Sequence, residues 1–292
     1  MSVCTIIPAY NAEAFLHRAI DSVLNQTAPV DEIIVVDDGS KDSTCAVAES
    51  YGPRVHLIRQ KNAGPAAARN LGVRSSNSDF IAFLDADDAW QPQKIEKQLA
   101  AFAANPGAVL CYTGVTHVHT EGWQEDFPVR PPDVLRSELR LGNPKLVPSC
   151  VMLTRAAFLQ VGGFDTSLKG SEDWDLVIAL LDLGPFYAVD EPLTLYQVSD
   201  SSLSADADWM FLETRKMLDR RLVADLHGPS RWLWRHRILS YHAYAAGLGA
   251  RTAGDRPKEL RYMLYSILLW PSPLWHPIRF KALTVSLKNR LS

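Results

Sequence analysis

The sequence predicts an α/β fold, in which a doubly wound, mainly parallel sheet is followed by a C-terminal helical region. Two observations support this prediction. Up to residue 90, short β-branched runs alternate with stretches whose apolar residues recur at helical spacing, as in βαβ units. Beyond residue 196 only helical patterns remain. With 292 residues, of which 47% are hydrophobic and 22% charged, the chain can bury a substantial core.

The elements follow one another in a regular order. Strands are predicted at residues 3–7, 32–36, 55–58, 80–84, 109–118, 149–153 and 186–196. Helices are predicted at residues 15–24, after Asp42 or Ser43, through the alanine-rich segment that carries Arg69 and Asn70, at 93–104, and from Ser171, as N-cap, to residue 183. Residues 120–148 contain prolines and charges without a clear period, so we expect a long surface loop there.

Composition indicates a cytoplasmic protein. The four cysteines, at positions 4, 45, 111 and 150, are widely separated and form no CxxC pair, which favours reduced thiols. The N-terminus lacks the basic and apolar regions of a signal peptide. The longest apolar stretch near the C-terminus, residues 262–270, is far shorter than the roughly 20 residues of a spanning helix. We therefore expect a chain that does not cross a bilayer.

The strongest signal for a functional site is the sequence Asp85-Ala86-Asp87-Asp88, which directly follows the apolar run of residues 80–84. Ligands of open α/β sheets bind at the carboxyl ends of strands, and clustered carboxylates repel each other unless a cation neutralises them. Magnesium and manganese prefer such oxygen ligands. Asp85 and Asp87 share one face of an extended chain, whereas Asp88 points elsewhere and could meet a second substrate. Alternatively, these acids only cap a turn.

Two further acidic pairs have two interpretations each. Asp37-Asp38 follows the second strand, where both acids could simply form a turn, or could accept hydrogen bonds from a base or ribose while Gly39 permits close approach. Glu172-Asp173 begins a predicted helix, where the macrodipole favours acids in any protein. Asp173 could equally act as a general base for an incoming hydroxyl. Local spacing alone leaves both pairs open.

Taken together and in order, four segments resemble one family. Residues 6–11, 34–44, 62–70 and 84–88 are similar to those of the inverting family two glycosyltransferases, which have the GT-A fold, a Rossmann-like doubly wound sheet. The resemblance covers about the first hundred residues well, and Glu172-Asp173 extends it to about residue 196.

The resemblance implies a nucleotide-diphosphate sugar as donor, most commonly a UDP-sugar, and Mn²⁺ or Mg²⁺ as cofactor. The residues that would bind the donor nucleotide are Pro8, Ala9, Tyr10, Asp37, Asp38, Arg69 and Asp85. Asp87, together with Asp85, would bind the metal, and Asp173 would be the catalytic base. The residues expected near the acceptor are Asp88, Glu172 and Trp174.

The implied reaction is a single displacement. The metal would neutralise the departing diphosphate, while Asp173 takes the proton of the attacking hydroxyl, so the anomeric configuration inverts. Two alternatives are a non-catalytic nucleotide-sugar-binding protein and a sugar-phosphate nucleotidyltransferase. The latter usually carries a glycine-rich basic loop after its first strand, where this chain has residues 8–11.

One departure from the family pattern concerns the diphosphate. Many relatives place basic residues after the last strand, whereas this chain has Gln197-Val198. Either Lys61, Arg69 or a cation within residues 120–148 substitutes for them, or closure over the donor works differently.

The resemblance and the charge distribution together suggest a division of the chain. We expect a catalytic domain at 1–205, with 1–105 binding the nucleotide-sugar and 106–205 the acceptor, and a helical region at 206–292. Residues 229–292 contain 11 Lys and Arg against 2 Asp and Glu, a charge of +9, which leaves −12 for the rest of the chain, whose total is −3.

This basic segment also contains Trp232, Trp234, Trp270 and Trp275. Such a mixture is typical of helices at an anionic membrane surface, although a solvated basic face on a packed helical subdomain is the alternative. Because acceptors of the family are often lipid-linked, we expect a saccharide or lipid-linked acceptor and peripheral contact with the inner face of the cell membrane. We expect no nucleic-acid partner.

Overall fold

The computed structural model describes residues 1–142, 146–198, 206–272 and 278–291. The chain divides into two compact units. The first comprises Met1–Ser137 and Asn143–Ser199, and the second comprises Glu138–Gly142 and Asp200–Ser292.

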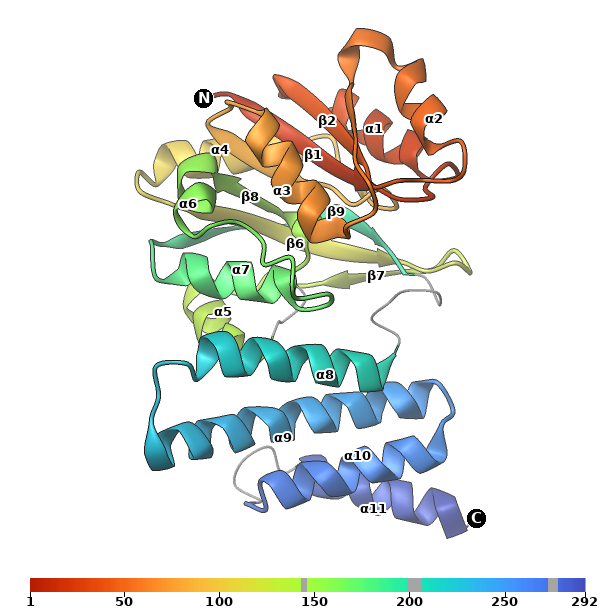
Figure 1. The fold of residues 1–292 in the computed structure, drawn as a ribbon, viewed down its shortest axis with the longest axis vertical. Coiled ribbons are helices and arrows are strands. Elements are labelled where there is room, and N and C mark those ends of the chain that lie inside the picture. The colour runs from red at the N-terminus through yellow and green to blue at the C-terminus, as the bar shows by residue number, and fades with distance from the viewer. Residues whose placement is uncertain (143–145, 199–205, 273–277, 292) are drawn as a thin grey trace. The chain divides into compact units, whose positions relative to one another are not determined.

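The first unit is built on one mixed sheet (Figure 1). In the described part of the chain this sheet has nine strands, in the order β3-β2-β1-β4-β8-β6-β9-β5, with β7 paired to β6. The strands are β1 (Val3–Ala9), β2 (Glu32–Asp37), β3 (His56–Arg59), β4 (Phe80–Phe83), β5 (Ala89–Trp90), β6 (Leu110–Val118), β7 (Gln124–Phe127), β8 (Val151–Thr154) and β9 (Phe186–Gln197). Of these, β1, β2, β3, β4, β6 and β9 run in one direction and β5, β7 and β8 in the other. The mainly parallel sheet predicted from the sequence is confirmed.

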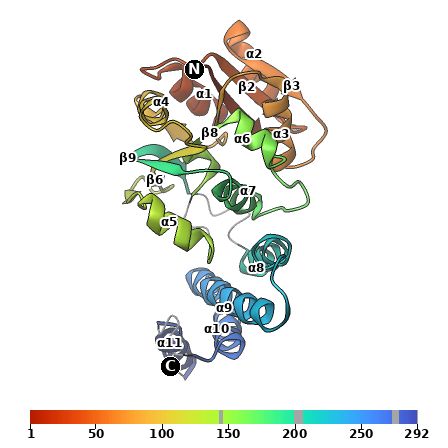
Figure 2. The same ribbon diagram turned by 90° about the vertical axis from the view of Figure 1, so that its left-hand side faces the viewer.

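Helices cover both faces of this sheet (Figure 2). The helices of the first unit are α1 (Leu16–Leu24), α2 (Thr44–Ser50), α3 (Pro65–Ser75), α4 (Lys94–Ala104), α6 (Arg155–Gln160), α7 (Glu172–Leu181) and α5 (Pro132–Leu139), of which the last two residues are assigned to the second unit. Leu16 and Ile20 of α1 and Ile95 of α4 join one buried cluster with strand residues. On the opposite face, Gly72 of α3 lies against Ile6 and Phe158 of α6 against Phe83. This double layer holds the strand ends in place.

Two local predictions were wrong, and a third is confirmed only in part. The segment 120–148, expected to be an irregular loop, contains β7 and α5. The strand expected from residue 149 is preceded by a 3₁₀ turn over Pro148–Cys150 and begins at Val151. Ser171 is the N-cap residue of α7, as predicted, but within the described part of the chain its hydroxyl makes no capping hydrogen bond. The segment 120–148 was misjudged because β7 is polar and largely exposed, and is held as a strand by its pairing with β6. A strand of this kind has no hydrophobic pattern that the sequence would reveal.

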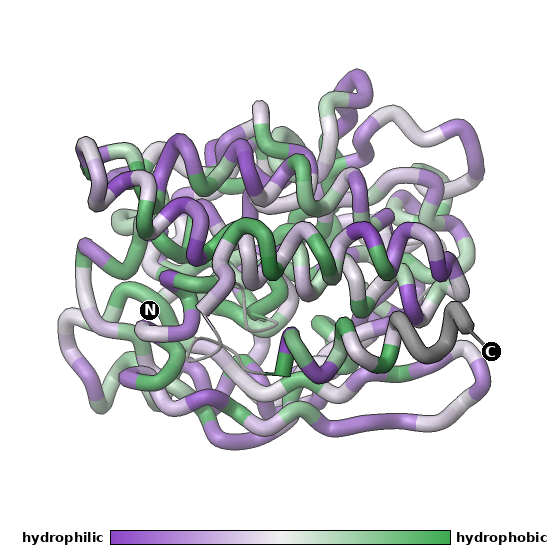
Figure 3. The backbone as a smooth tube through the Cα atoms, turned by 90° about the horizontal axis from the view of Figure 1, so that it is seen from below, coloured by the Kyte–Doolittle hydropathy of each residue, from purple (hydrophilic) through white to green (hydrophobic). Residues whose placement is uncertain are grey.

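The second unit is helical in its described residues. It contains α8 (Ala207–Met217), a π-helical turn (Leu218–Leu222), α9 (Gly228–Thr252), α10 (Arg256–Leu269) and α11 (Ile278–Leu291). Helices α9 and α10 pack closely, since a Cβ added at Gly247 of α9 would lie 2.9 Å from Cε of Met263 in α10. Figure 3 shows hydrophobic and hydrophilic residues interleaved along the backbone. Among the described residues, no helix combines the length and apolar character needed to cross a membrane.

Candidate active site at the carboxyl edge of the sheet

The sheet register brings three of the predicted segments together. β1 lies between β2 and β4 and is parallel to both, with Ala9 opposite Asp37 and Ile6 opposite Phe83. The carboxyl ends of the three strands therefore meet at one edge, as in other open α/β sheets. Pro8 and Ala9 are buried there, whereas the side chain of Tyr10 is 48% exposed. The edge thus offers an accessible aromatic ring beside buried acids.

Asp38 holds the loop that leads into α3. Its Oδ1 accepts hydrogen bonds from the side chain of Gln60, at 2.7 Å, and from the backbone N–H of Ala63, at 2.8 Å. Its Oδ2 accepts one from the N–H of Gly64, at 2.8 Å. Gly39 lies close against the same loop, because a Cβ added at this position would lie 3.0 Å from the backbone nitrogen of Asn62. Asp38 therefore shapes the predicted nucleotide site by fixing this loop.

Arg69 connects the predicted metal motif to the predicted base. It is buried on α3, with one Nη 2.5 Å from Oδ1 of Asp85 and the other 3.6 Å from Oε1 of Glu172. Burial opposes the charge, but the carboxylates of Asp85, Glu172 and Asp173 raise the pKa of Arg69 above its ordinary value. The guanidinium also lies over the ring of Phe164. Arg69 thus forms ion pairs with one carboxylate in the D-x-D turn and one at the start of α7.

The two D-x-D acids, Asp85 and Asp87, are the residues predicted to bind a metal. Asp85 and Asp87 are both partly buried. Burial, and then the charge of Asp85, raise the pKa of Asp87, so the two carboxylates repel each other. No group of three or more His, Cys, Asp or Glu among the described residues could hold a metal alone. Magnesium sites typically use one or two carboxylates plus substrate phosphates, and Asp87 with Asp85 fits that pattern.

Asp88 faces the interior. Its Oδ2 accepts a hydrogen bond from the hydroxyl of Ser149, at 2.6 Å, and its Oδ1 one from the N–H of Gln197, at 2.9 Å. Ser149 Oγ in turn accepts one from the N–H of Asp85, at 3.0 Å. Asp88 is 1% exposed, so it ties the D-x-D turn to β9 and to the turn before β8. This environment differs from the acceptor contact expected of Asp88, because both oxygens are engaged inside the protein.

The predicted base, Asp173, lies in the first turn of α7. Asp173 is partly buried, and its Oδ1 accepts a hydrogen bond from the N–H of Trp174, at 2.6 Å. Burial, and then the charge of Glu172, raise the pKa of Asp173 to about 7, while Arg69 acts in the opposite direction. A carboxylate with this pKa can accept a proton near neutral pH. Trp174 itself is 3% exposed and belongs to the core.

Sequence reasoning missed several residues that build this site. Gln60 and Ser149 hold Asp38 and Asp88, and Gln197 was read only as a departure from the family pattern. Arg18 of α1 was missed entirely. Its guanidinium donates to the backbone carbonyl of Asp87 and, at 3.0 Å, to Oε1 of Gln197. Helical spacing marks Arg18 only as a surface residue, because its partners lie 69 and 179 positions away.

The chain is similar to known glycosyltransferases. The family model described as Glycosyl transferase family 2 matches residues 4–162. An uncharacterized glycosyltransferase of Haemophilus influenzae is 33% identical over 221 residues, covering 73% of this chain and 74% of its own. A Bacillus subtilis glycosyltransferase named for teichuronic acid biosynthesis is 30% identical over 210 residues, covering 70% and 82%.

Solved structures show the same fold. TarS of S. aureus, residues 1–349 in complex with UDP, superposes with a TM-score of 0.66 and 19% identity, covering 100% of this chain and 92% of that one. A mannosyltransferase of Pyrobaculum calidifontis, in complex with GDP-Man and Mn²⁺, gives a TM-score of 0.62 and 19% identity, covering 99% and 86%. From the match over more than half of its length, this chain is a glycosyltransferase that belongs to glycosyl transferase family 2.

Proposed function

We propose that this protein is a metal-dependent, inverting glycosyltransferase that moves a sugar from a UDP-sugar to an acceptor hydroxyl of a growing polysaccharide or lipid-linked oligosaccharide. The observation that carries the proposal is the ion-pair bridge of Arg69, which brings the D-x-D acid Asp85 and the start of α7 into one cluster. Donor and acceptor chemistry can therefore meet at one edge of the sheet.

The molecules bound by similar proteins support the choice of substrates. Structures of TarS contain UDP and UDP-GlcNAc, and that of the mannosyltransferase contains GDP-Man and Mn²⁺. The Bacillus subtilis relative is named for teichuronic acid biosynthesis, and another relative is a chondroitin synthase of Escherichia coli, 31% identical over 192 residues. These names favour a polymeric product.

The mechanism follows from the positions of the acids. A bound divalent cation, held by Asp87 and Asp85, would offset the negative charge of the diphosphate leaving group. Asp173 accepts the proton of the acceptor hydroxyl as that oxygen bonds to the anomeric carbon. The bond from the anomeric carbon to the phosphate oxygen breaks, and its electron pair leaves with the diphosphate. Arg69 holds Glu172 beside the base, which limits the mutual repulsion of the two acids.

Substitution of the base tests this function. With Mn²⁺ and a panel of UDP-sugars and saccharide acceptors, Asp173→Asn is expected to lower kcat by about 10²- to 10⁴-fold and to leave the donor Kd unchanged. Asp182→Asn, at the exposed C-terminal end of the same helix, is the matched control and is expected to retain activity. Wild-type protein that binds UDP-sugars but transfers none to any acceptor would instead indicate a non-catalytic nucleotide-sugar-binding protein.

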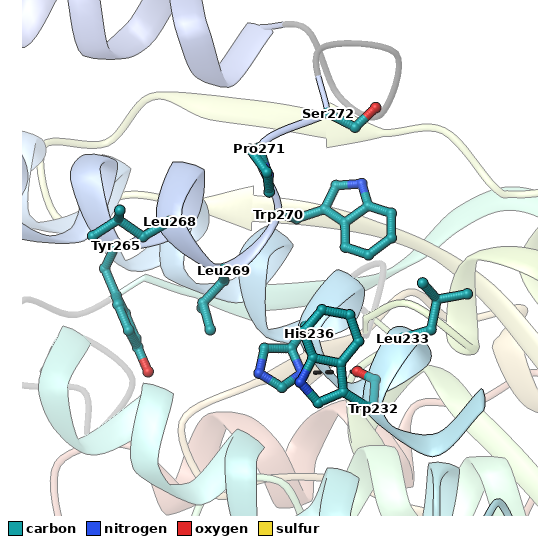
Figure 4. Close-up of a pocket in the computed structure, with 9 residues that line it drawn as sticks. All are labelled: Trp232, Leu233, His236, Tyr265, Leu268, Leu269, Trp270, Pro271 and Ser272. Atoms are coloured by element: carbon teal, nitrogen blue, oxygen red, sulfur yellow. Dashed lines mark hydrogen bonds between the residues drawn. The ribbon is translucent and has the colours of Figure 1, made fainter. Parts of the chain in front are cut away.

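We propose in addition that the second unit contacts an anionic membrane surface. An apolar groove of about 700 Å³ lies between α9 and α10, with Trp232, Leu233 and His236 on one side and Tyr265, Leu268 and Trp270 on the other (Figure 4). Leu268 is 79% and Trp232 57% exposed, and the buried Nε1 of Trp270 has no hydrogen-bond partner among the described residues. Trp275, part of the predicted membrane-binding mixture, lies outside the described residues.

The charge of this segment favours an anionic partner. Residues 229–292 carry a formal charge of +9, and the guanidinium of Arg237 stacks over the ring of Trp234. Exposed tryptophan and leucine beside arginine are characteristic of surfaces that bind at the headgroup level of a bilayer. Such a contact would place the enzyme close to a lipid-linked acceptor.

A further inference from the structure

A surface cation lies beside the D-x-D turn. Leu16, Ala19 and Ile20 of α1 are buried, while Arg18 is on the exposed flank of this helix. Its side chain reaches the turn, where one Nη donates to the carbonyl of Asp87 and the other to Oε1 of Gln197. Arg18 therefore approaches the predicted metal ligand from a different element than Arg69 does.

The guanidinium of Arg18 is held in this position by a prearranged partner. Nε2 of Gln197 donates to the carbonyl of Val118, at 3.0 Å, which turns its Oε1 toward Arg18. The N–H of Gln197 donates to Asp88, so the end of β9 is fixed to the D-x-D turn as well. A guanidinium has five N–H donors, and these two contacts leave further donors for a ligand.

A nucleoside diphosphate carries more negative charge than a single divalent cation neutralises, so a nearby side-chain cation would stabilise it further. Arg69 is poorly suited to this task, because it is buried between the carboxylates of Asp85 and Glu172. Lys61 belongs to the loop that Asp38 fixes, at the end of β3 rather than at the D-x-D turn. Arg18 combines exposure with direct contact to the turn, and arginine binds phosphate oxygens in a bidentate manner.

On the basis of the proposed function, we infer that Arg18 binds the diphosphate of the nucleotide-sugar donor and that Gln197 positions its guanidinium. In this interpretation, α1 supplies the cation that many relatives place after the last strand, and the glutamine at position 197 is the partner of that cation.

Comparing UDP with UMP isolates this role, because only UDP carries the second phosphate. Calorimetric titrations would use wild type, Arg18→Ala and Arg18→Lys, in EDTA and again with Mn²⁺. In EDTA, Arg18→Ala is expected to weaken UDP binding by about 10- to 100-fold, the range for a hydrogen bond to a charged group, and to leave UMP binding unchanged. Arg18→Lys should recover part of the loss, since it keeps the charge without the bidentate geometry.

Two controls separate this role from general damage to the site. Arg74→Ala removes another exposed arginine, in the last turn of α3, and should change neither affinity. Gln197→Ala should weaken UDP binding less than Arg18→Ala does. Equal loss of UDP and UMP binding in Arg18→Ala, or no loss at all, would overturn the inference while leaving the proposed function intact. Wild type that binds no nucleoside diphosphate would overturn the proposed function, and this inference with it.

Discussion

Asp173 lies at the start of α7, and the pKa of its carboxyl group is higher than that of an ordinary aspartate. Burial and the neighbouring Glu172 raise the pKa of Asp173 from 3.8 to about 7. We therefore expect kcat/KM to fall about tenfold per pH unit below pH 7, as the base becomes protonated. A pH–rate profile of the wild type at saturating Mn²⁺ would show this limb.

The raised pKa of Asp173 also makes the free energy of unfolding depend on pH. Between pH 4 and 7 the folded state binds a proton at Asp173 that the unfolded chain releases, so this group makes stability fall as pH rises. Asp173→Asn removes the effect. By calorimetry it should melt at least about 2 °C above wild type at pH 8, with the difference vanishing near pH 4. A difference that is constant with pH would contradict this assignment.

At the scale of elements, the packing of α3 on β1 positions Arg69. A Cβ added at Gly72 of α3 would lie 2.5 Å from Cγ2 of Ile6, so only glycine allows this approach. Gly72→Ala is expected to destabilise the protein by about 1–3 kcal/mol through overpacking.

A second helical glycine is the control. An added Cβ at Gly249 in α9 has no atom of the described residues within 4 Å, so Gly249→Ala should stabilise by about 0.5–1 kcal/mol through helix propensity alone. Urea denaturation of both variants measures the two effects. Similar urea midpoints for the two variants would show that α3 and β1 can move apart to accommodate the added methyl group, and would contradict this prediction.

At the scale of the whole molecule, charge is divided along the chain. Residues 229–292 carry +9 and the remainder −12, and the apolar groove of the second unit lies within the basic segment. Wild type should co-sediment with phosphatidylglycerol vesicles at low salt, and less so at high salt because exposed charges are screened.

Variants of the groove test this membrane contact. Leu268→Glu, which adds a charge at the most exposed large hydrophobic residue of the groove, should abolish binding to the vesicles, as should deletion of residues 229–292. Leu159→Glu changes a leucine of α6 that is 46% exposed and should bind as wild type does. Vesicle binding that survives Leu268→Glu would exclude the groove as a membrane site. A concentration-dependent self-association that Trp232→Glu removes would also exclude it, and would indicate that another copy of the chain occupies the groove.

The sequence by itself determined the fold class and the identity of the acidic clusters. Parallel strands with helices on both faces follow from local periodicity, and each acid directly follows a strand or begins a helix. These features are encoded within a few neighbouring residues, so they can be read without knowing the pairing of the strands.

Only the tertiary structure decided what each acid touches. Asp38 and Asp88 are both acids at strand ends, yet one holds the loop before α3 and the other is buried against Ser149 and Gln197. Arg69 and Arg18 approach the D-x-D turn from different helices, over contacts that span 16 and 69 residues. Hydrogen bonds between segments that are distant in the sequence produce no periodic pattern in it. For that reason the direction of each acidic side chain, and the exposed position of Arg18 at the D-x-D turn, could be seen only in the tertiary structure.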